Sequence, residues 1–387
     1  MSPELIAQVL FWLALSLVVN TYVIYPIFVF LVGMIRIRKQ RSYAYSNLPT
    51  VTVVVSVYNE ETVIEDKLKN HEASDYPAEK VSFLFGSDGS TDSTNEVLRR
   101  CHGENVVPHL FSRRRGKAAV LNDLVNESQS EIVIFSDANT SFRPDTVRML
   151  VQPFADPTVG AVCGELVVVS DSQTTGGFGE RLYWKLENML KTGESRISST
   201  LGATGAVYAI RKSLFVPLPL GKVVMDDFII PMGVLKRGFR IVYNPDAVAY
   251  ERPTNSVGGE FRRRIRIAAA NFNGISEYSS LLTPRKGFVA FALWSHKLLR
   301  WVVPFLFLIV LGSTAFAART SPFFLLVLWV EIAFLFMAFL GFVLDRLKIN
   351  AGIFGMPYYF VAINCALIVG FIRYLFGSQQ PTWEIVR

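Results

Sequence analysis

Four aspartates that follow short apolar segments have the clearest potential for chemistry. Asp88 lies in Ser-Asp-Gly-Ser-Thr-Asp, Asp137 lies in Ser-Asp-Ala-Asn, and Asp226 and Asp227 are adjacent. Carboxylates at strand ends can bind a divalent cation through their oxygens, or accept hydrogen bonds from a nucleobase or a ribose. The same short sequences also form turns and helix caps. For any one aspartate taken alone, both interpretations are open.

Two runs of basic residues complement these carboxylates. Residues 113–117 are Arg-Arg-Arg-Gly-Lys, and residues 262–266 are Arg-Arg-Arg-Ile-Arg. A diphosphate requires dense positive charge to bind it and to stabilise it as it leaves. A basic face on anionic lipid is the alternative. The sequence contains no Walker P-loop and no GxGxxG fingerprint, and its four histidines form no evident hydrolase triad.

Short β-branched runs alternate with segments of helical character, and the acidic motifs follow the runs. The sequence predicts strands over Val51–Val57, Val81–Gly86 and Glu131–Phe135, and helices over Thr62–Asn70, Ser93–Arg100 and Lys117–Asn126. This alternation predicts an α/β sheet with right-handed crossovers. In such sheets ligands bind beyond the carboxyl ends of the strands, which is where the aspartates fall.

The composition indicates a membrane protein. The 387 residues are 51% hydrophobic and only 18% charged, with a formal net charge of +7. The mean hydropathy is +0.33. These values argue against a purely soluble or disordered chain. Three scattered cysteines (Cys101, Cys163 and Cys365) predict neither a disulfide framework nor a metal site.

Long apolar segments lie at both ends of the chain. Leu5–Ile35 is long enough to span a bilayer, and the basic residues 36–41 that follow it predict that the next region is cytoplasmic. Trp301–Ala318 and Pro322–Leu344 are two further spans, and Ile353–Ile372 is a third segment that crosses, is re-entrant or lies at the interface. The side on which residues 379–387 lie depends on that segment. We expect an anchor in residues 1–41, a cytoplasmic domain in 42–286, and an interfacial segment with two to three spans in 287–387.

Two features near the predicted spans have alternative explanations. Residues 178–190 have the apolar periodicity of an amphipathic helix, which lies either among lipid headgroups or on the sheet. Glu331 lies within an otherwise apolar span, where it either pairs with a polar residue of another span or lines a path for a glycan or lipid. We favour pairing.

Six motifs in order carry a resemblance to a known family. They are Val55–Glu60 (Val-Ser-Val-Tyr-Asn-Glu), 87–92 (Ser-Asp-Gly-Ser-Thr-Asp), 115–122 (Arg-Gly-Lys-Ala-Ala-Val-Leu-Asn), 136–139 (Ser-Asp-Ala-Asn), 226–227 (Asp-Asp) and 262–264 (Arg-Arg-Arg). Residues 50–270, with the flanking spans, resemble the membrane-integrated branch of family 2 glycosyltransferases, which includes cellulose, chitin, hyaluronan and chitooligosaccharide synthases. The resemblance implies an α/β GT-A fold, a Rossmann-like nucleotide-diphospho-sugar transferase domain flanked by transmembrane helices.

The same resemblance implies an inverting reaction and a set of site residues. Asp227 would be the general base, and Asp226 beside it would raise its proton affinity. Asp137 matches the first position of the family's DxD motif, which binds the donor and a metal, Mg2+ or Mn2+. Asn139 replaces the second carboxylate with a neutral oxygen ligand. The implied nucleotide and donor contacts are Tyr58, Asn59, Glu60, Asp88, Arg115, Lys117, Asp137 and Arg264.

The predicted acceptor side departs from the pattern of processive members. Their Gln-x-x-Arg-Trp motif is here Phe-Arg-Arg-Arg-Ile, so that Ile265 stands where a tryptophan would stack on the acceptor sugar. This departure argues against long-chain synthesis, although Trp184 or another aromatic residue could substitute. Gly202, Thr204 and Gly205 resemble the segment that lines the acceptor site, and a plain tight turn explains them equally well.

The resulting hypothesis is a membrane glycosyltransferase that transfers a sugar from a nucleotide sugar, expected to be a UDP-sugar, to a glycan or lipid-linked acceptor, without nucleic-acid partners. Processive polysaccharide biosynthesis coupled to export, and addition of one sugar to a lipid, are the enzymatic alternatives. A transporter or a non-catalytic scaffold that binds the donor is the alternative of another class.

Overall fold

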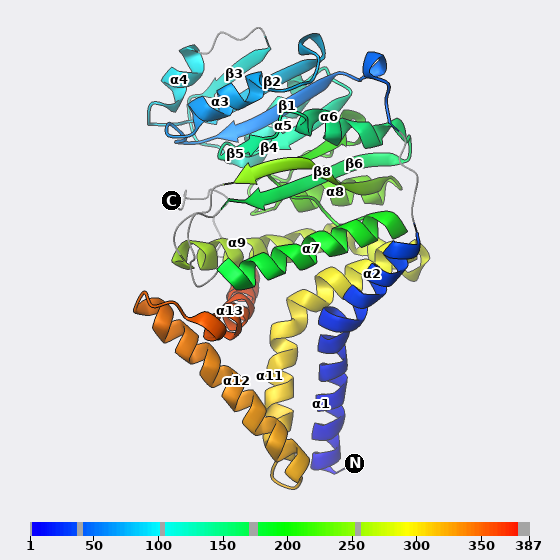
Figure 1. The fold of residues 1–387 in the computed structure, drawn as a ribbon, viewed down its shortest axis with the longest axis vertical. Helices are drawn as coiled ribbons and strands as arrows, with labels where there is room; N and C mark the ends of the chain where they lie inside the picture. The colour runs from blue at the N-terminus through cyan, green and yellow to red at the C-terminus, as the bar shows by residue number, and fades with distance from the viewer. Residues whose placement is uncertain (1, 37–41, 101–104, 170–176, 252–256, 378–387) are drawn as a thin grey trace.

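The computed structural model describes residues 2–36, 42–100, 105–169, 177–251 and 257–377. An α/β region lies at one end of the molecule and a group of long helices at the other (Figure 1). Residues 37–41 of the predicted basic flank, Cys101 and the tail 379–387 lie outside the described residues. Cys163 is a buried free thiol and Cys365 an exposed one.

The α/β region is built on an eight-stranded mixed sheet with the order β3-β2-β1-β4-β7-β6-β8-β5. The strands β3, β2, β1 and β4 are mutually parallel, whereas β7 is antiparallel to both β4 and β6. β6 pairs parallel with β8, and β5 pairs antiparallel with β8. The strand bounds are β1 Val51–Val57, β2 Val81–Asp88, β3 Val106–Phe111, β4 Ile132–Ser136, β5 Thr140–Phe142, β6 Val159–Val168, β7 Tyr208–Arg211 and β8 Arg240–Glu251. The predicted α/β class is confirmed, with a second half that is mixed rather than parallel.

Helices cover the sheet, which explains why its first strands are continuous apolar runs. Every residue of 51–55 in β1 is buried, as a strand covered on both faces requires. Gly86 in β2 allows α5 to approach, because a Cβ at this position would lie 2.3 Å from Val120 Cγ1. The helices of this half are α3 Ile64–Glu72, α4 Thr94–Arg100, α5 Lys117–Glu127 and α6 Thr146–Val151.

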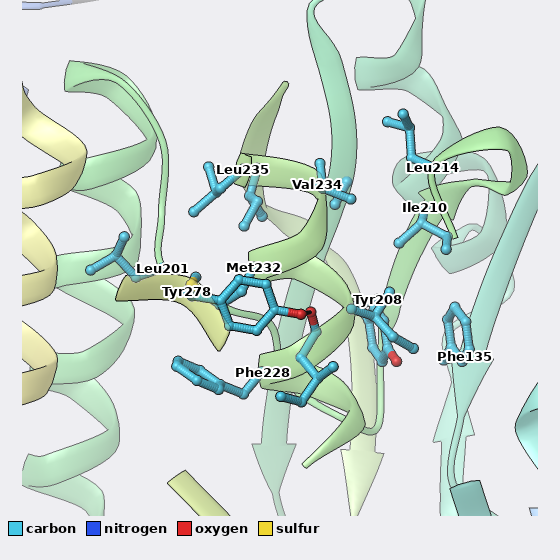
Figure 2. Close-up of a cluster of buried hydrophobic side chains, with 14 of the residues drawn as sticks. Phe135, Leu201, Tyr208, Ile210, Leu214, Phe228, Met232, Val234, Leu235 and Tyr278 are labelled. Atoms are coloured by element: carbon cyan, nitrogen blue, oxygen red, sulfur yellow. Dashed lines mark hydrogen bonds between the residues drawn. The ribbon is translucent and has the colours of Figure 1, made fainter. Parts of the chain in front are cut away.

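The core of the second half surrounds α8 (Asp226–Lys236), whose first turn carries Asp226 and Asp227. Phe228 and Met232 of this helix are buried, and the Tyr278 hydroxyl donates to the Ile229 carbonyl over 2.9 Å (Figure 2). The Tyr208 ring stacks on Phe135 with centroids 4.5 Å apart. This packing fixes the start of α8 beside the carboxyl end of β4.

Within the described residues, four helices are long and apolar enough to cross a membrane. They are Pro3–Ile35 (α1 Pro3–Val19, a π-helical turn Asn20–Ile24, and α2 Tyr25–Ile35), Phe288–Ala317 (α10 Phe288–Ala292, a π-helical turn Leu293–Leu298, and α11 Leu299–Ala317), α12 Pro322–Arg346, and Gly352–Leu375, which contains α13 Gly355–Leu375. The length and composition of these helices indicate a membrane protein. The predicted interfacial segment is continuous with α11, and the last apolar segment forms a helix of spanning length. The Glu331 carboxylate accepts a hydrogen bond from Thr314 of α11 over 3.0 Å, as the pairing hypothesis expects.

Two helices, α7 (Gly177–Ile197) and α9 (Val257–Ile275), lie between the sheet and the apolar helices (Figure 1). α7 packs on α2 at two glycines, since a Cβ on Gly33 would lie 2.8 Å from the Gly193 Cα. α7 also contacts β8 of the sheet, so this helix packs against protein on both sides.

A buried ionic cluster joins α7 to the second apolar helix. His296 Nδ1 lies 2.6 Å from Glu194 Oε1, and the Tyr25 hydroxyl donates to the same oxygen over 2.6 Å. Arg300 donates to Glu187 over 2.9 Å. Burial opposes ionisation of Glu187, but His296 and the neighbouring cations hold its pKa well below the usual range. The cluster fixes α7 to the apolar helices.

Candidate active site

An ammonium group connects the carboxylates of two separate motifs. Lys117, the first residue of α5, places Nζ 2.8 Å from Asp137 Oδ1 and 3.2 Å from Asp226 Oδ1. Burial alone would lower the pKa of Lys117, but Asp137 and Asp226 raise it. Three residues far apart in sequence, each predicted from a motif, therefore meet at one edge of the sheet.

The adjacent aspartates of α8 have different partners. Asp226 accepts a hydrogen bond from the Tyr208 hydroxyl over 3.0 Å, in addition to its contact with Lys117. Asp227 accepts one from the backbone N–H of Gly205 over 3.1 Å. Burial, followed by the charge of Asp226, raises the pKa of Asp227 to about 7. A carboxylate with this proton affinity is suited to removing a proton near neutral pH.

The loop that carries the predicted acceptor residues wraps around the start of α8. Gly202 adopts φ +91°, a left-handed conformation that favours glycine. The Ala203 N–H donates to the Asp227 carbonyl over 2.8 Å. Thr204 Oγ1 accepts a hydrogen bond from Lys191 over 2.7 Å, and Lys191 Nζ lies 6.0 Å from the centre of the Trp184 ring. The loop is thus held against the predicted base, and Trp184 lies near it.

Asp88 organises the basic loop before α5. Its two carboxylate oxygens accept the backbone N–H groups of Arg115 and Gly116 over 2.7 and 2.8 Å. The Arg115 side chain turns to Asp123, 2.7 Å away, and lies over the Phe111 ring. Asp88 therefore shapes the loop that delivers Lys117 to the carboxylates.

A small pocket lies beside this loop. The Arg114 guanidinium lies 3.8 Å from the centre of the Tyr58 ring. The pocket is lined by Ser56, Val57, Tyr58, Asp88, Arg114, Gly116 and Lys117. A flat cation on an aromatic ring can stack with a nucleobase, and its charge can attract a phosphate.

Asn59 and Glu60 hold the loop opposite. The Asn59 amide oxygen accepts the Thr91 N–H over 2.8 Å, and the Glu60 N–H donates to Thr94 Oγ1 over 2.8 Å. Asn59 has φ +51°, so the chain turns sharply at this point. These two residues connect the end of β1 to the segment after β2, and their predicted contacts with the nucleotide stay predictions.

The turn after β4 presents Asp137 and Asn139. Burial alone would raise the pKa of Asp137, but Lys117, with Lys67 and Arg263, holds it below its usual value. The Asn139 amide donates to Glu251 Oε1 over 3.0 Å. Carboxylate and amide oxygens suit Mg2+ or Mn2+. In the described part of the chain, no group of three or more His, Cys, Asp or Glu residues is arranged to hold a metal ion.

The arginine-rich helix α9 places Arg264 and Ile265 differently from the prediction that they contact the diphosphate and the acceptor. Arg264, the predicted diphosphate contact, donates to the Tyr359 hydroxyl of α13 over 3.1 Å. Ile265 is buried, and its backbone carbonyl packs against Gly370 of α13. Arg263 lies close enough to Asp137 to lower the pKa of that carboxyl. Arg266 interacts electrostatically with Asp137, Asp226 and Asp227, and burial lowers its pKa. Arg263 and Arg266 are three residues apart on one helix and therefore share a face. This spacing is the signal that could have identified them.

Comparison with known proteins relates this α/β region and its cluster of charges to sugar-transferring enzymes. The family model "Glycosyl transferase family 2" matches residues 52–215. This region includes Asp88, Lys117 and Asp137 and ends before Asp226. Residues 52–215 thus match a family 2 glycosyl transferase domain.

Two curated relatives and one solved structure are similar to the chain. The poly-beta-1,6-N-acetyl-D-glucosamine synthase of Staphylococcus aureus is 27% identical over 266 residues, 64% of this chain and 64% of the relative. The synthase of the same name from Staphylococcus epidermidis is 23% identical over 56% of this chain and 53% of its own length. The chain thus matches less than two thirds of either relative.

The mannosyltransferase PcManGT from Pyrobaculum calidifontis, in complex with GDP-Man and Mn2+, superposes with a TM-score of 0.71 at 24% identity. The match covers 96% of this chain and 100% of the other. It confirms the GT-A fold of the α/β region.

Proposed function

We propose that the protein is an inverting glycosyltransferase that moves a sugar from a nucleotide sugar, expected to be a UDP-sugar, to a glycan or lipid-linked acceptor at the membrane. The observation that carries this proposal is the position of Asp227. Its carboxylate lies beside the Lys117–Asp137–Asp226 cluster and against the loop of Gly202 and Gly205. The base, the diphosphate-binding charges and the acceptor loop are therefore contiguous.

In the proposed reaction Asp227 removes the proton of an acceptor hydroxyl. The acceptor oxygen forms a bond to the anomeric carbon on the face opposite the diphosphate. The bond from that carbon to the diphosphate oxygen breaks, and the electron pair leaves with the nucleoside diphosphate. Displacement from the opposite face inverts the configuration, and Asp226 supports it by keeping the proton affinity of Asp227 high.

Lys117, Arg263 and Arg266 supply positive charge where the leaving diphosphate gains negative charge. Asp137, with the amide oxygen of Asn139, would hold a divalent ion together with the diphosphate oxygens. Such an ion, when bound, neutralises the diphosphate and improves it as a leaving group. Tyr58 and Arg114, together with the loop held by Asp88, would receive the nucleoside.

A second candidate is a processive β-polysaccharide synthase whose product crosses the membrane. The similarity to poly-beta-1,6-N-acetyl-D-glucosamine synthases and the candidate spans favour it. The buried Ile265 favours addition of a single sugar, because that position offers no exposed ring to the acceptor. In either case we place the catalytic region on the cytoplasmic side, from the basic residues 36–41.

The experiment is release of nucleoside diphosphate by the full chain in lipid nanodiscs. UDP-N-acetylglucosamine, UDP-glucose and GDP-mannose are supplied with Mn2+ or Mg2+ and membrane lipid extract, and products are sized by mass spectrometry. Turnover with one donor supports the proposal, and a single added sugar or a ladder distinguishes the two candidates. Absence of both turnover and donor binding with every nucleotide sugar would contradict it.

A further inference from the structure

A buried lysine lies directly behind the turn that presents Asp137 and Asn139. Lys67 of α3 is 1% exposed. Its Nζ donates to Ser136 Oγ over 2.7 Å, to the Thr140 carbonyl over 2.7 Å and to Thr140 Oγ1 over 3.1 Å. Lys67 thus contacts the residue before Asp137 and the residue after Asn139, and all three of its N–H donors are used.

The turn itself is closed by further hydrogen bonds around this ammonium. Thr140 Oγ1 donates to the Asp137 carbonyl over 2.9 Å and lies 3.1 Å from Ser136 Oγ. Removal of the ammonium would leave Ser136 Oγ and the Thr140 carbonyl without the buried donor that they share. The backbone direction at Asp137 therefore depends on a side chain that does not touch the Asp137 carboxylate.

A charge in this position is costly. An apolar side chain would fill the space between α3 and the sheet without desolvating an ammonium. Burial lowers the pKa of Lys67 to about 7, opposed only by the attraction of Asp137. The Lys67 ammonium also lies 4.8 Å from the centre of the Phe142 ring. A purely structural role thus explains the position poorly, whereas an action on Asp137 explains both its charge and its location.

We propose that Lys67 is a positioning residue that holds the Ser136–Thr140 turn in the form that presents Asp137 and Asn139 to the nucleotide sugar and its metal ion. The inference rests on the proposed function. Outer residues that orient metal ligands commonly change metal affinity by about 10–100-fold when they are replaced. Because position 139 holds an asparagine and not a second carboxylate, binding of the metal ion depends more strongly on the orientation and charge of Asp137.

The test compares Lys67→Met with the wild-type chain in nanodiscs. We expect the Kd of Mn2+ with UDP (or with GDP, if that is the donor nucleotide), measured by calorimetry, to rise by about tenfold or more. The donor KM should rise in parallel, and kcat should change much less. Lys69→Met is the matched control, because Lys69 is on the same helix but exposed, paired with Glu65. It should leave Kd, KM and kcat unchanged.

A role in stability alone gives a different pattern. A lower melting temperature of Lys67→Met with unchanged Mn2+ affinity and donor KM would overturn the inference. If Lys67→Met does not fold, Thr140→Val takes its place in the test. This change removes the hydroxyl that lies between Lys67 and the Asp137 carbonyl. Unchanged Mn2+ affinity of Thr140→Val would then overturn the inference. When Asn139→Ala is combined with either variant, the loss of Mn2+ affinity should be smaller than the sum of the separate losses. The reason is that both substitutions act through the same turn. Wild type that binds Mn2+ and nucleotide but transfers no sugar would contradict the proposed function while leaving this inference testable.

Discussion

The backbone N–H of Gly205 donates a hydrogen bond to the carboxylate of Asp227 over 3.1 Å. A Cβ on Gly205 would lie 3.3 Å from the same carboxylate oxygen, so the loop and the aspartate are in close contact. The predicted acceptor segment and the predicted base, which lie 22 residues apart in sequence, thus form one unit. An acceptor bound on this loop would have its hydroxyl close to Asp227.

The pH dependence of transfer should report the ionisation of Asp227. Its pKa is raised to about 7, first by burial and then by Asp226, and only the deprotonated form can accept a proton. We therefore expect kcat/KM to fall as the pH decreases below about 7. Asp226→Asn removes the like charge and should move this acidic limb to lower pH, although loss of the contact with Lys117 should also reduce the maximal rate. The measurement is a pH–rate profile of both proteins.

Asp66→Asn provides the control for this profile, because Asp66 is exposed on α3. Its acidic limb should coincide with that of the wild type. An acidic limb that is the same in the wild type and in Asp226→Asn would show that the carboxylate pair does not set the proton affinity of the base.

The packing of α7 on α2 should be sensitive to one methyl group. A Cβ on Gly193 would lie 2.5 Å from Val29 Cγ1 and 2.8 Å from the Val29 carbonyl oxygen. Gly193→Ala should therefore force the helices apart, at a cost of about 1–3 kcal/mol. Thermal unfolding in nanodiscs measures this change. Gly312→Ala in α11 is the control, because an added Cβ there meets no described atom within 4 Å. Equal melting temperatures for the two variants would refute the close packing.

The ionic cluster at Glu187 should contribute strongly to stability. Glu187 contacts His296, Lys297 and Arg300 in a site where its side chain is 8% exposed. Glu187→Ala leaves these cations without their shared carboxylate, and breaking a buried pair in this way costs about 3–5 kcal/mol. The measurement is chemical unfolding in detergent. Glu65→Ala, which removes an exposed pair with Lys69, should have no measurable effect. Similar results for both variants would contradict the role of the cluster.

The sequence was sufficient for the first half of the sheet and for the charged residues that follow its strands. Asp88, Lys117 and Asp137 stand in motifs directly beside apolar runs, and parallel strands bring such positions to one edge. The sequence does not predict the direction of β7, because a strand as short as Tyr208–Arg211 carries no signal for it. The antiparallel pairing became visible only in three dimensions.

The remaining differences arise from helix orientation. Three consecutive arginines point to different sides of α9, so the side that faces the carboxylates depends on how α9 packs against α13 and α8. Arg264 therefore contacts Tyr359, while Arg263 and Arg266 lie toward the aspartates. Lys67 cannot be identified from the sequence for a similar reason. In sequence it resembles the exposed Lys69 two residues later, and its burial depends on the position of α3 above β4 and β5.

The most direct test of the account is Asp227→Asn, measured for both transfer and binding. The amide keeps the shape of the side chain but cannot accept the acceptor's proton, so kcat should fall by about 100-fold or more. The affinity for nucleoside diphosphate with Mn2+ should stay close to that of the wild type, since Lys117 and Asp137 remain. Transfer at the wild-type rate by Asp227→Asn, with the product confirmed by mass spectrometry, would contradict the assignment of Asp227 as the base.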